Sequence, residues 1–154
     1  MPLLNYTTTI EATKTVGEIQ LILMSHGARS LLLDCKDGTI DGISFIVSTS
    51  KGEISFRLPV KTEAAFRKLQ GMHPKQRKCP DYAVKDKAQA IRVAWRITKD
   101  WVEAQMALIE LGMASLEEVF LPYALLASGE TVYQALERTN FRMISSGKVE
   151  AGND

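Results

Sequence analysis

KAQAIRVAWRITKDWVEAQMALIEL, residues 87–111, places apolar or small side chains on most sides of a helix. At 100° per residue, its main polar side chains share a stripe about 80° wide. The stripe consists of Gln89, Arg92, Arg96, Lys99, Glu103 and Glu110. We expect a helix with so narrow a polar stripe to lie at the centre of the molecule. Asp86 and Gln89 form a capping-box pattern at its start, and Gly112 suits its end.

Two shorter helices are predicted upstream of this long helix. Thr15 and Glu18 form a capping-box pattern for a helix over residues 16–26. A second helix is predicted over residues 63–70, with Thr62 as its N-cap.

Three strand-like runs lie between these two helices, over residues 29–35, 39–49 and 53–58. The middle run alternates apolar and polar side chains, which is the period of a half-buried strand. The Asp-Gly pair at 37–38 and the glycine-containing turn at 50–52 predict tight connections. We therefore expect the three runs to form an antiparallel meander.

The C-terminal part carries two further capping-box patterns, Ser115 with Glu118 and Thr131 with Gln134, which predict short helices. Pro122 should stop or kink the first of them near residues 120–121. The chain therefore predicts an α+β fold. It has an N-terminal helix, a three-stranded antiparallel meander sheet packed on a long central helix, and short C-terminal helices.

Composition bounds the class of protein. With 154 residues, 45% hydrophobic and 24% charged, the chain is expected to form one globular domain over residues 1–144, followed by a polar tail over 145–154. The N-terminal residues lack the pattern of a signal peptide, and no apolar run is long enough to span a membrane. Two cysteines give no sign of an oxidising compartment. We expect a cytoplasmic protein.

Charge is distributed unevenly along the chain. Residues 57–99 hold twelve of the nineteen basic side chains and three acidic ones, which gives 12 − 3 = +9. Residues 1–56 carry 4 − 6 = −2 and residues 100–154 carry 3 − 9 = −6, so the total is only +1. Solvated charges act over about 8–10 Å, so the local excess matters more than the total. The positive middle predicts a polyanionic partner, nucleic acid first, unless the basic and acidic parts pair with each other.

The candidate nucleic-acid-binding residues come from three places in sequence order: the end of the third strand, the loop predicted over 71–83, and the helical stripe. They are Arg57, Lys75, Arg77, Lys78, Tyr82, Arg92, Arg96 and Lys99. We expect them to line a groove between sheet and helix, where the cations would contact phosphates and Tyr82 would stack on a base. The alternative for the stripe is pairing within the helix, Arg96 with Asp100 and Lys99 with Glu103.

Catalytic chemistry is sparse in this sequence. Two histidines and two cysteines occur without a CxxC, HxxxH or HxxE spacing, and no nucleotide-binding glycine motif is present. Both tryptophans are expected to pack in the core. We expect a protein that is not an enzyme and that has neither a metal nor a cofactor.

The runs AIRVAWRITKDWVEAQMALIELGMASLEEVFLPY, TVGEIQLILMSHGA and ISFRLPV resemble small bacteriophage and prophage proteins of uncharacterised activity. The helix–meander–helix order, with Gly52, Glu53, Phe56, Leu58 and Pro59 in its last strand, resembles the core of phage single-strand annealing proteins of the Rad52, ERF and Sak type. That resemblance implies rings that hold single-stranded DNA in a basic groove, within the bacterial host cytosol. Double-stranded RNA-binding domains share this order, but KTEAA (61–65) replaces their KKxAK helix start.

Two expectations about partners follow. The positive middle and the negative C-terminal part suit head-to-tail association of identical subunits, with the apolar segment 120–123 near the negative part. The alternative is a monomer in which that segment packs into its own core. A phage protein could instead use its charged surfaces to bind and inhibit a host defence or nucleic-acid enzyme.

Overall fold

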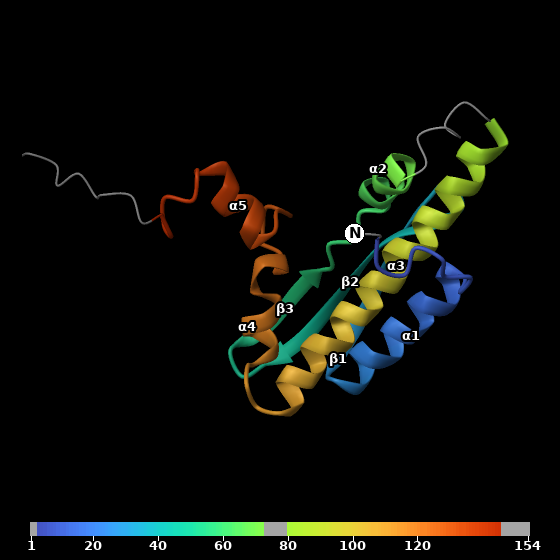
Figure 1. Cartoon of the computed structure of the whole chain (residues 1–154). Helices are drawn as coiled ribbons and strands as arrows, with labels where there is room; N and C mark the ends of the chain where they lie inside the picture. Colours follow the sequence, from blue (N-terminus) through green and yellow to red (C-terminus); the bar gives the residue numbers. More distant parts are fainter. Residues whose placement is uncertain (1–2, 73–79, 146–154) are drawn as a thin grey trace, which may run out of the picture.

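The computed structural model describes residues 3–72 and 80–145, with the side chains of 80–86 excepted. The elements follow the predicted order, and the α+β fold with one antiparallel meander is confirmed (Figure 1). They are α1 (Ala12–Ser25), β1 (Ala28–Lys36), β2 (Thr39–Thr49), β3 (Gly52–Arg57), α2 (Thr62–Met72), α3 (Pro80–Glu110), α4 (Leu116–Phe120), the 3₁₀ turn η2 (Leu121–Tyr123) and α5 (Val132–Arg138).

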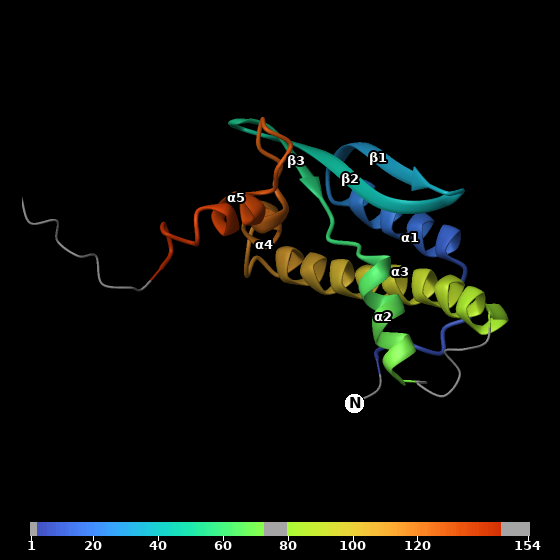
Figure 2. The same ribbon diagram turned by 90° about the horizontal axis from the view of Figure 1, so that it is seen from above.

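The sheet has the strand order β1-β2-β3, and both neighbouring pairs are antiparallel. Asp37 and Gly38 both have positive φ, 51° and 76°, as a two-residue hairpin turn requires. Figure 2 shows α1 and α3 on one side of the sheet. The opposite side of the sheet carries no helix among the described residues, and we call it the outer face.

The core lies between the inner face of the sheet and α3. Phe45 on β2 stacks on its cross-strand partner Phe56 with ring centroids 5.2 Å apart, and Phe120 meets Phe45 edge-on at 5.7 Å. Trp95 is fully buried and donates a hydrogen bond from Nε1 to the Ile40 carbonyl, 3.2 Å away. Trp101 packs edge-on against Phe120. The expectation that both tryptophans serve packing is confirmed.

The C-terminal part closes the edge of β3. Both predicted capping boxes are present, and the helix after Ser115 ends at Phe120, one residue before the turn that contains Pro122. The Leu125 N–H then donates to the Ser55 carbonyl at 2.7 Å, so this segment continues the sheet beyond β3. This bridge pairs one backbone carbonyl of the edge strand that would otherwise be exposed.

The predicted start of the first helix is wrong by four residues. α1 begins at Ala12, and the Thr15 hydroxyl is not a cap but donates to the Glu11 carbonyl from within the helix. Thr15 is buried with Val16 because both lie on the face that meets the core. Tertiary packing therefore overrides the local capping pattern, and Glu18 has a different partner.

The predicted start of the long helix is also wrong. α3 begins at Pro80, a residue type that suits the first helical position because it lacks the N–H that would be left without a partner. Asp86 is therefore inside the helix, and the Gln89 side chain donates to the carbonyls of Tyr6 and Thr8, both at 2.9 Å. The loop expected over 71–83 is shorter at both ends, since α2 runs to Met72.

Candidate nucleic-acid interface

The three predicted cations of α3 are paired, Arg92 and Arg96 with carboxylates at the N-cap and within α1, and Lys99 with a carboxylate of α3 itself. Arg96 Nη1 lies 2.6 Å from Glu18 Oε2, and Arg92 Nη1 lies 3.8 Å from Glu11 Oε1. The Lys99 ammonium lies 2.7 Å from Glu103, which was the alternative partner predicted for it. We call Arg92, Arg96 and Lys99 the paired stripe. Their side chains are only 24%, 17% and 13% exposed, so most of their charge is turned toward other parts of the subunit.

His26 extends the same pattern to the far end of α1. Its Nε2 lies 2.7 Å from Glu110 Oε1 on α3, and its Nδ1 lies 2.7 Å from the Ile22 carbonyl. The hydrogen bond to the Ile22 carbonyl raises the pKa of His26; burial opposes this shift, and Glu110 adds to it. Ionic contacts therefore join α1 to α3 along most of the length of α1.

Four of the predicted residues lie outside what the structure describes. Lys75, Arg77 and Lys78 fall between α2 and α3, outside the described residues. Tyr82 belongs to the first turn of α3, and its side chain is likewise outside the described part. Their expected role in binding stays a prediction.

Arg57 occupies a different surface from the paired stripe. Phe56 faces the core opposite Phe45, so Arg57, the next residue along β3, projects from the outer face beside Ser44. There it lines a hollow of about 360 Å³. Core side chains fill most of the space between the sheet and α3. Hollows of about 580 and 210 Å³ remain at its β1–β2 hairpin end; Arg92 lines the smaller one, and Arg57 lines neither. The structure does not bring Arg57 together with the stripe.

Arg57 also borders a second hollow, of about 190 Å³, between the β3–α2 connection and the C-terminal segment. Lys61 lines it from one side, and Tyr123, Tyr133 and Gln134 line it from the other. Figure 1 shows α5 beside the end of β3, which brings these distant parts of the sequence together.

Lys61 leads in turn to a third hollow, of about 290 Å³, between α2 and α3. Its floor consists of small and apolar side chains such as Ala64, Ala65 and Ile97, and Lys68 stands at its border with Lys61. The three hollows are linked, because the first two share Arg57 and the last two share Lys61. We call this surface the β3–α2 track.

Among the residues that the structure describes, no acidic side chain lines the β3–α2 track. Arg57, Lys61 and Lys68 are exposed, and none of them forms an ion pair within the described residues. A larger hollow, of about 580 Å³, differs in this respect, because Lys36 and Lys87 share it with three carboxylates. Its acidic members are Asp37, Asp41 and Glu63. An anionic ligand is therefore favoured on the track and not in the larger hollow.

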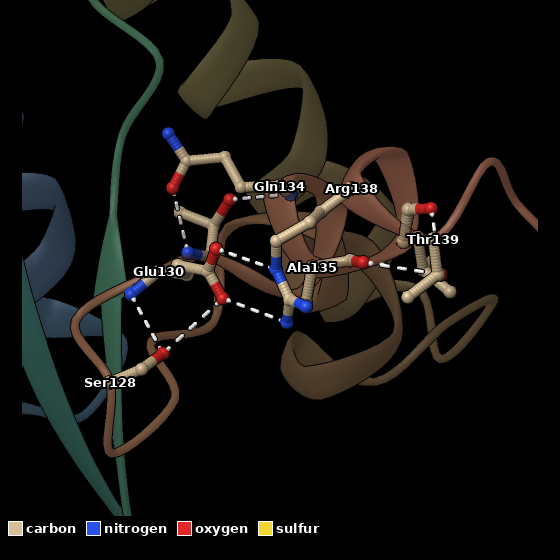
Figure 3. Close-up of polar contacts among 8 residues, drawn as sticks. Ser128, Glu130, Gln134, Ala135, Arg138 and Thr139 are labelled. Carbon is tan, nitrogen blue, oxygen red and sulfur yellow. Dashed lines mark hydrogen bonds and ion pairs between the residues drawn. The ribbon is translucent and has the colours of Figure 1, made fainter.

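The contacts that position α5 are local and well defined. Glu130 accepts hydrogen bonds from Arg138 Nε and Nη2 at 3.1 and 3.3 Å, which ties the end of α5 back to the preceding turn (Figure 3). At the start of α5, Thr131 Oγ1 accepts from the Gln134 N–H, and Gln134 Oε1 accepts from the Thr131 N–H. Both ends of α5 are thus held by contacts with residues 130 and 131, directly before the helix.

Sequence reasoning missed Lys61, Lys68, Tyr123 and Tyr133. One signal could have identified Lys68, since no acidic residue occurs between Glu63 and the aspartate at position 81, but Lys61 lies just before this stretch. No comparable signal existed for the tyrosines. They join the track through folding of the C-terminal segment onto β3, which has no local signature.

Within residues 3–72 and 80–145, no group of three or more His, Cys, Asp or Glu side chains is arranged to hold a metal ion. In the same part of the chain, no helix has both the length and the apolar character needed to cross a membrane. Comparison of the chain with protein-family models, with curated proteins and with solved structures finds no match.

Proposed function

We propose that this protein binds nucleic acid along the β3–α2 track, and that its ligand is single-stranded DNA in phage recombination. The observation that carries the proposal is the set of three linked hollows, in which Arg57, Lys61 and Lys68 are exposed and no acidic side chain of the described residues takes part in the lining. Cations that lack an internal partner can neutralise phosphates and release the counterions condensed on them. Phosphate contacts of this kind provide affinity without sequence preference.

We expect the paired stripe to bind phosphate more weakly than the track does. Each of its cations would have to exchange a carboxylate for a phosphate, and the carboxylate would lose its own partner. The track also borders the most basic part of the sequence, since Arg67 lies on α2 and Lys75, Arg77 and Lys78 follow α2 in the chain.

The activity we infer is binding and annealing, not catalysis, and it needs neither metal nor cofactor. It agrees with the resemblance of the helix–meander–helix order to phage single-strand annealing proteins. A protein with this activity would act in the cytosol of the bacterial host, where phage DNA recombines.

Fluorescence-anisotropy titration of labelled single- and double-stranded oligonucleotides at several salt concentrations tests the proposal. Three phosphate contacts predict a slope of about −2 in log K against log salt, because each single-strand contact contributes about 0.7. The variant Lys61→Glu/Lys68→Glu should bind roughly tenfold more weakly or worse, with a slope reduced by about 1.4. Absence of binding to either oligonucleotide at low salt would rule the function out.

A matched control is available in Lys14→Glu/Lys51→Glu. Both lysines are exposed, neither lines the track, and the change in net charge is the same. This control should keep most of the affinity. Equal losses in the two double variants would mean that total charge, and not the track, governs binding.

The rival is a host protein partner, because an acidic protein surface could also recognise the track. A pull-down from bacterial lysate after nuclease treatment separates the two ligands. Loss of all captured partners supports nucleic acid, whereas a stoichiometric host protein supports the inhibitor.

We also propose that the protein is a homo-oligomer joined through its C-terminal part. Phe120 of the apolar segment 120–123 is buried in its own core and Tyr123 packs on Trp101, so that segment contributes less free surface than expected. Its neighbours contribute more. Of twelve exposed large apolar side chains in the described residues, seven lie between 111 and 144: Leu111, Met113, Leu121, Leu126, Tyr133, Met143 and Ile144. They are concentrated in one stretch of the sequence, and exposed apolar side chains that form a contiguous patch mark contacts with partners.

A further inference from the structure

The hollow at the middle of the β3–α2 track combines cations with exposed aromatic surface. Tyr133 on α5 is 48% exposed, although its ring lies only 5.9 Å from that of Phe141 at an angle of 50°. Tyr123 borders the same hollow and is held edge-on against Trp101 at 5.5 Å. One ring is therefore fixed in the wall, while the other keeps much of its surface open to a ligand.

The exposed ring of Tyr133 belongs to α5, a helix that side-chain contacts hold at both ends. The reciprocal cap between Thr131 and Gln134 fixes the first turn of α5, and the Glu130–Arg138 ion pair fixes its last turn. A stacking surface gains affinity when its own position is settled before the ligand arrives, because less conformational entropy is then lost on binding.

The polar groups around this ring suit a nucleotide. Arg57 and Lys61 border the hollow and can each contact a phosphate. The side-chain oxygen of Gln134 is used by the cap, so its amide N–H groups are the part that can donate to a base edge. No carboxylate of the described residues lines this hollow, so an anionic sugar–phosphate backbone meets no repulsion from these walls.

We propose that this hollow receives one nucleobase stacked on Tyr133, with the flanking phosphates on Arg57 and Lys61. The inference rests on the proposed function and makes it more specific, since it requires the bases to be accessible. Bases in a duplex are stacked on each other and paired, whereas bases of a single strand present a free face to an aromatic ring. The site is therefore expected to select single strands.

A cycle between the protein and the oligonucleotide isolates the base contact. Wild-type protein and Tyr133→Ala are titrated with a single-stranded oligonucleotide and with a fully abasic strand of the same length. We expect the alanine variant to bind the intact strand about five- to a hundredfold more weakly, the range typical of one lost stacking contact. On the abasic strand the two proteins should bind equally. The salt slope should be the same for both, because Tyr133 contacts no phosphate.

The conservative variant Tyr133→Phe keeps the ring and should bind like the wild type, and circular dichroism of both variants checks that α5 and the fold persist. Unchanged affinity of Tyr133→Ala for the intact strand overturns the base site, as does an equal loss on both strands. If the Lys61→Glu/Lys68→Glu variant still loses affinity in that case, nucleic-acid binding stands and only the stacking site falls. If the wild type binds no oligonucleotide, both ideas fall.

Discussion

The paired stripe of α3 and the β3–α2 track come from the same +9 segment of the chain, yet the structure uses their cations in opposite ways. Arg92 and Arg96 meet carboxylates of α1, and both side chains are less than a quarter exposed. Lys61 and Lys68 stand in hollows without acidic side chains. Charge excess along a sequence therefore does not identify a binding surface. The position of the acidic residues in the fold decides which cations remain available.

The largest effect is expected on stability, when the charge at the centre of the paired stripe is reversed. Arg96→Glu would set two carboxylates against each other where Glu18 is 32% exposed and Arg96 only 17%. We expect the free energy of unfolding to fall by about 2–3 kcal/mol, as for a mostly buried ion pair that loses one partner. Urea denaturation followed by circular dichroism measures it.

The swap Glu18→Arg/Arg96→Glu is the control for this variant, and it should recover much of the lost stability by restoring the pair in reverse. Nucleic-acid affinity should fall less for Arg96→Glu than for Lys61→Glu, while Lys61→Glu should leave the unfolding midpoint nearly unchanged. If instead Arg96→Glu lost more affinity than Lys61→Glu, the division between structural and ligand-binding cations would be wrong.

The comparison extends to the C-terminal part, which carries −6 and most of the exposed apolar side chains. Met143 and Ile144 are 84% and 65% exposed. Met143→Glu/Ile144→Glu should shift an oligomer toward the 17.1 kDa monomer in light scattering at tens of micromolar. Exposed surface changes of this kind should cost the fold less than about 0.5 kcal/mol. A single monomeric species for the wild type at low and at high salt contradicts the oligomer.

The smallest effect is expected at His26, which joins the end of α1 to Glu110. Its pKa is raised in the folded state, chiefly by the Ile22 carbonyl and further by Glu110. The contact therefore stabilises the fold fully below the ordinary pKa of 6.5 and loses its contribution as pH rises through the raised value.

His26→Gln measures this contribution. The unfolding midpoint of the variant should fall below that of the wild type at pH 5.5, and the gap should narrow at pH 8.5. Since Glu110 is 66% exposed, we expect a difference below about 1 kcal/mol. A gap that widens with rising pH would mean that the charged form of His26 is not the stabilising one.

Features that depend on neighbouring residues could be predicted from the sequence better than features that depend on tertiary packing. The caps at Ser115 and Thr131 were predicted correctly because each involves residues three apart at a helix start. The same pattern at Thr15 gave a wrong helix start, since packing against the core turned that side chain inward. The meander and the central helix followed from periodicity, which reflects burial directly.

The candidate site was only partly accessible from the sequence, for the same physical reason. Arg57 is exposed, as a binding residue has to be. The stripe was also predicted to bind the ligand, because the carboxylates that pair with Arg92 and Arg96 could not be identified from the sequence. Glu11 and Glu18 precede Arg92 and Arg96 by more than seventy residues, so only the packing of α1 on α3 brings them together. Tyr133 and Lys61 line the same hollow, although they are also far apart in the sequence.

The hydrogen bond from Leu125 to Ser55 also has a consequence for synthesis on the ribosome. One wall of the middle hollow comes from residues 57–61 and the other from residues 123–134, so the hollow cannot close until most of the chain has been translated. A nascent or prematurely terminated chain would carry all the cations of the track but not its aromatic wall. Such a fragment could attract polyanions without discriminating among them, and the discriminating surface would appear only once the chain is nearly finished.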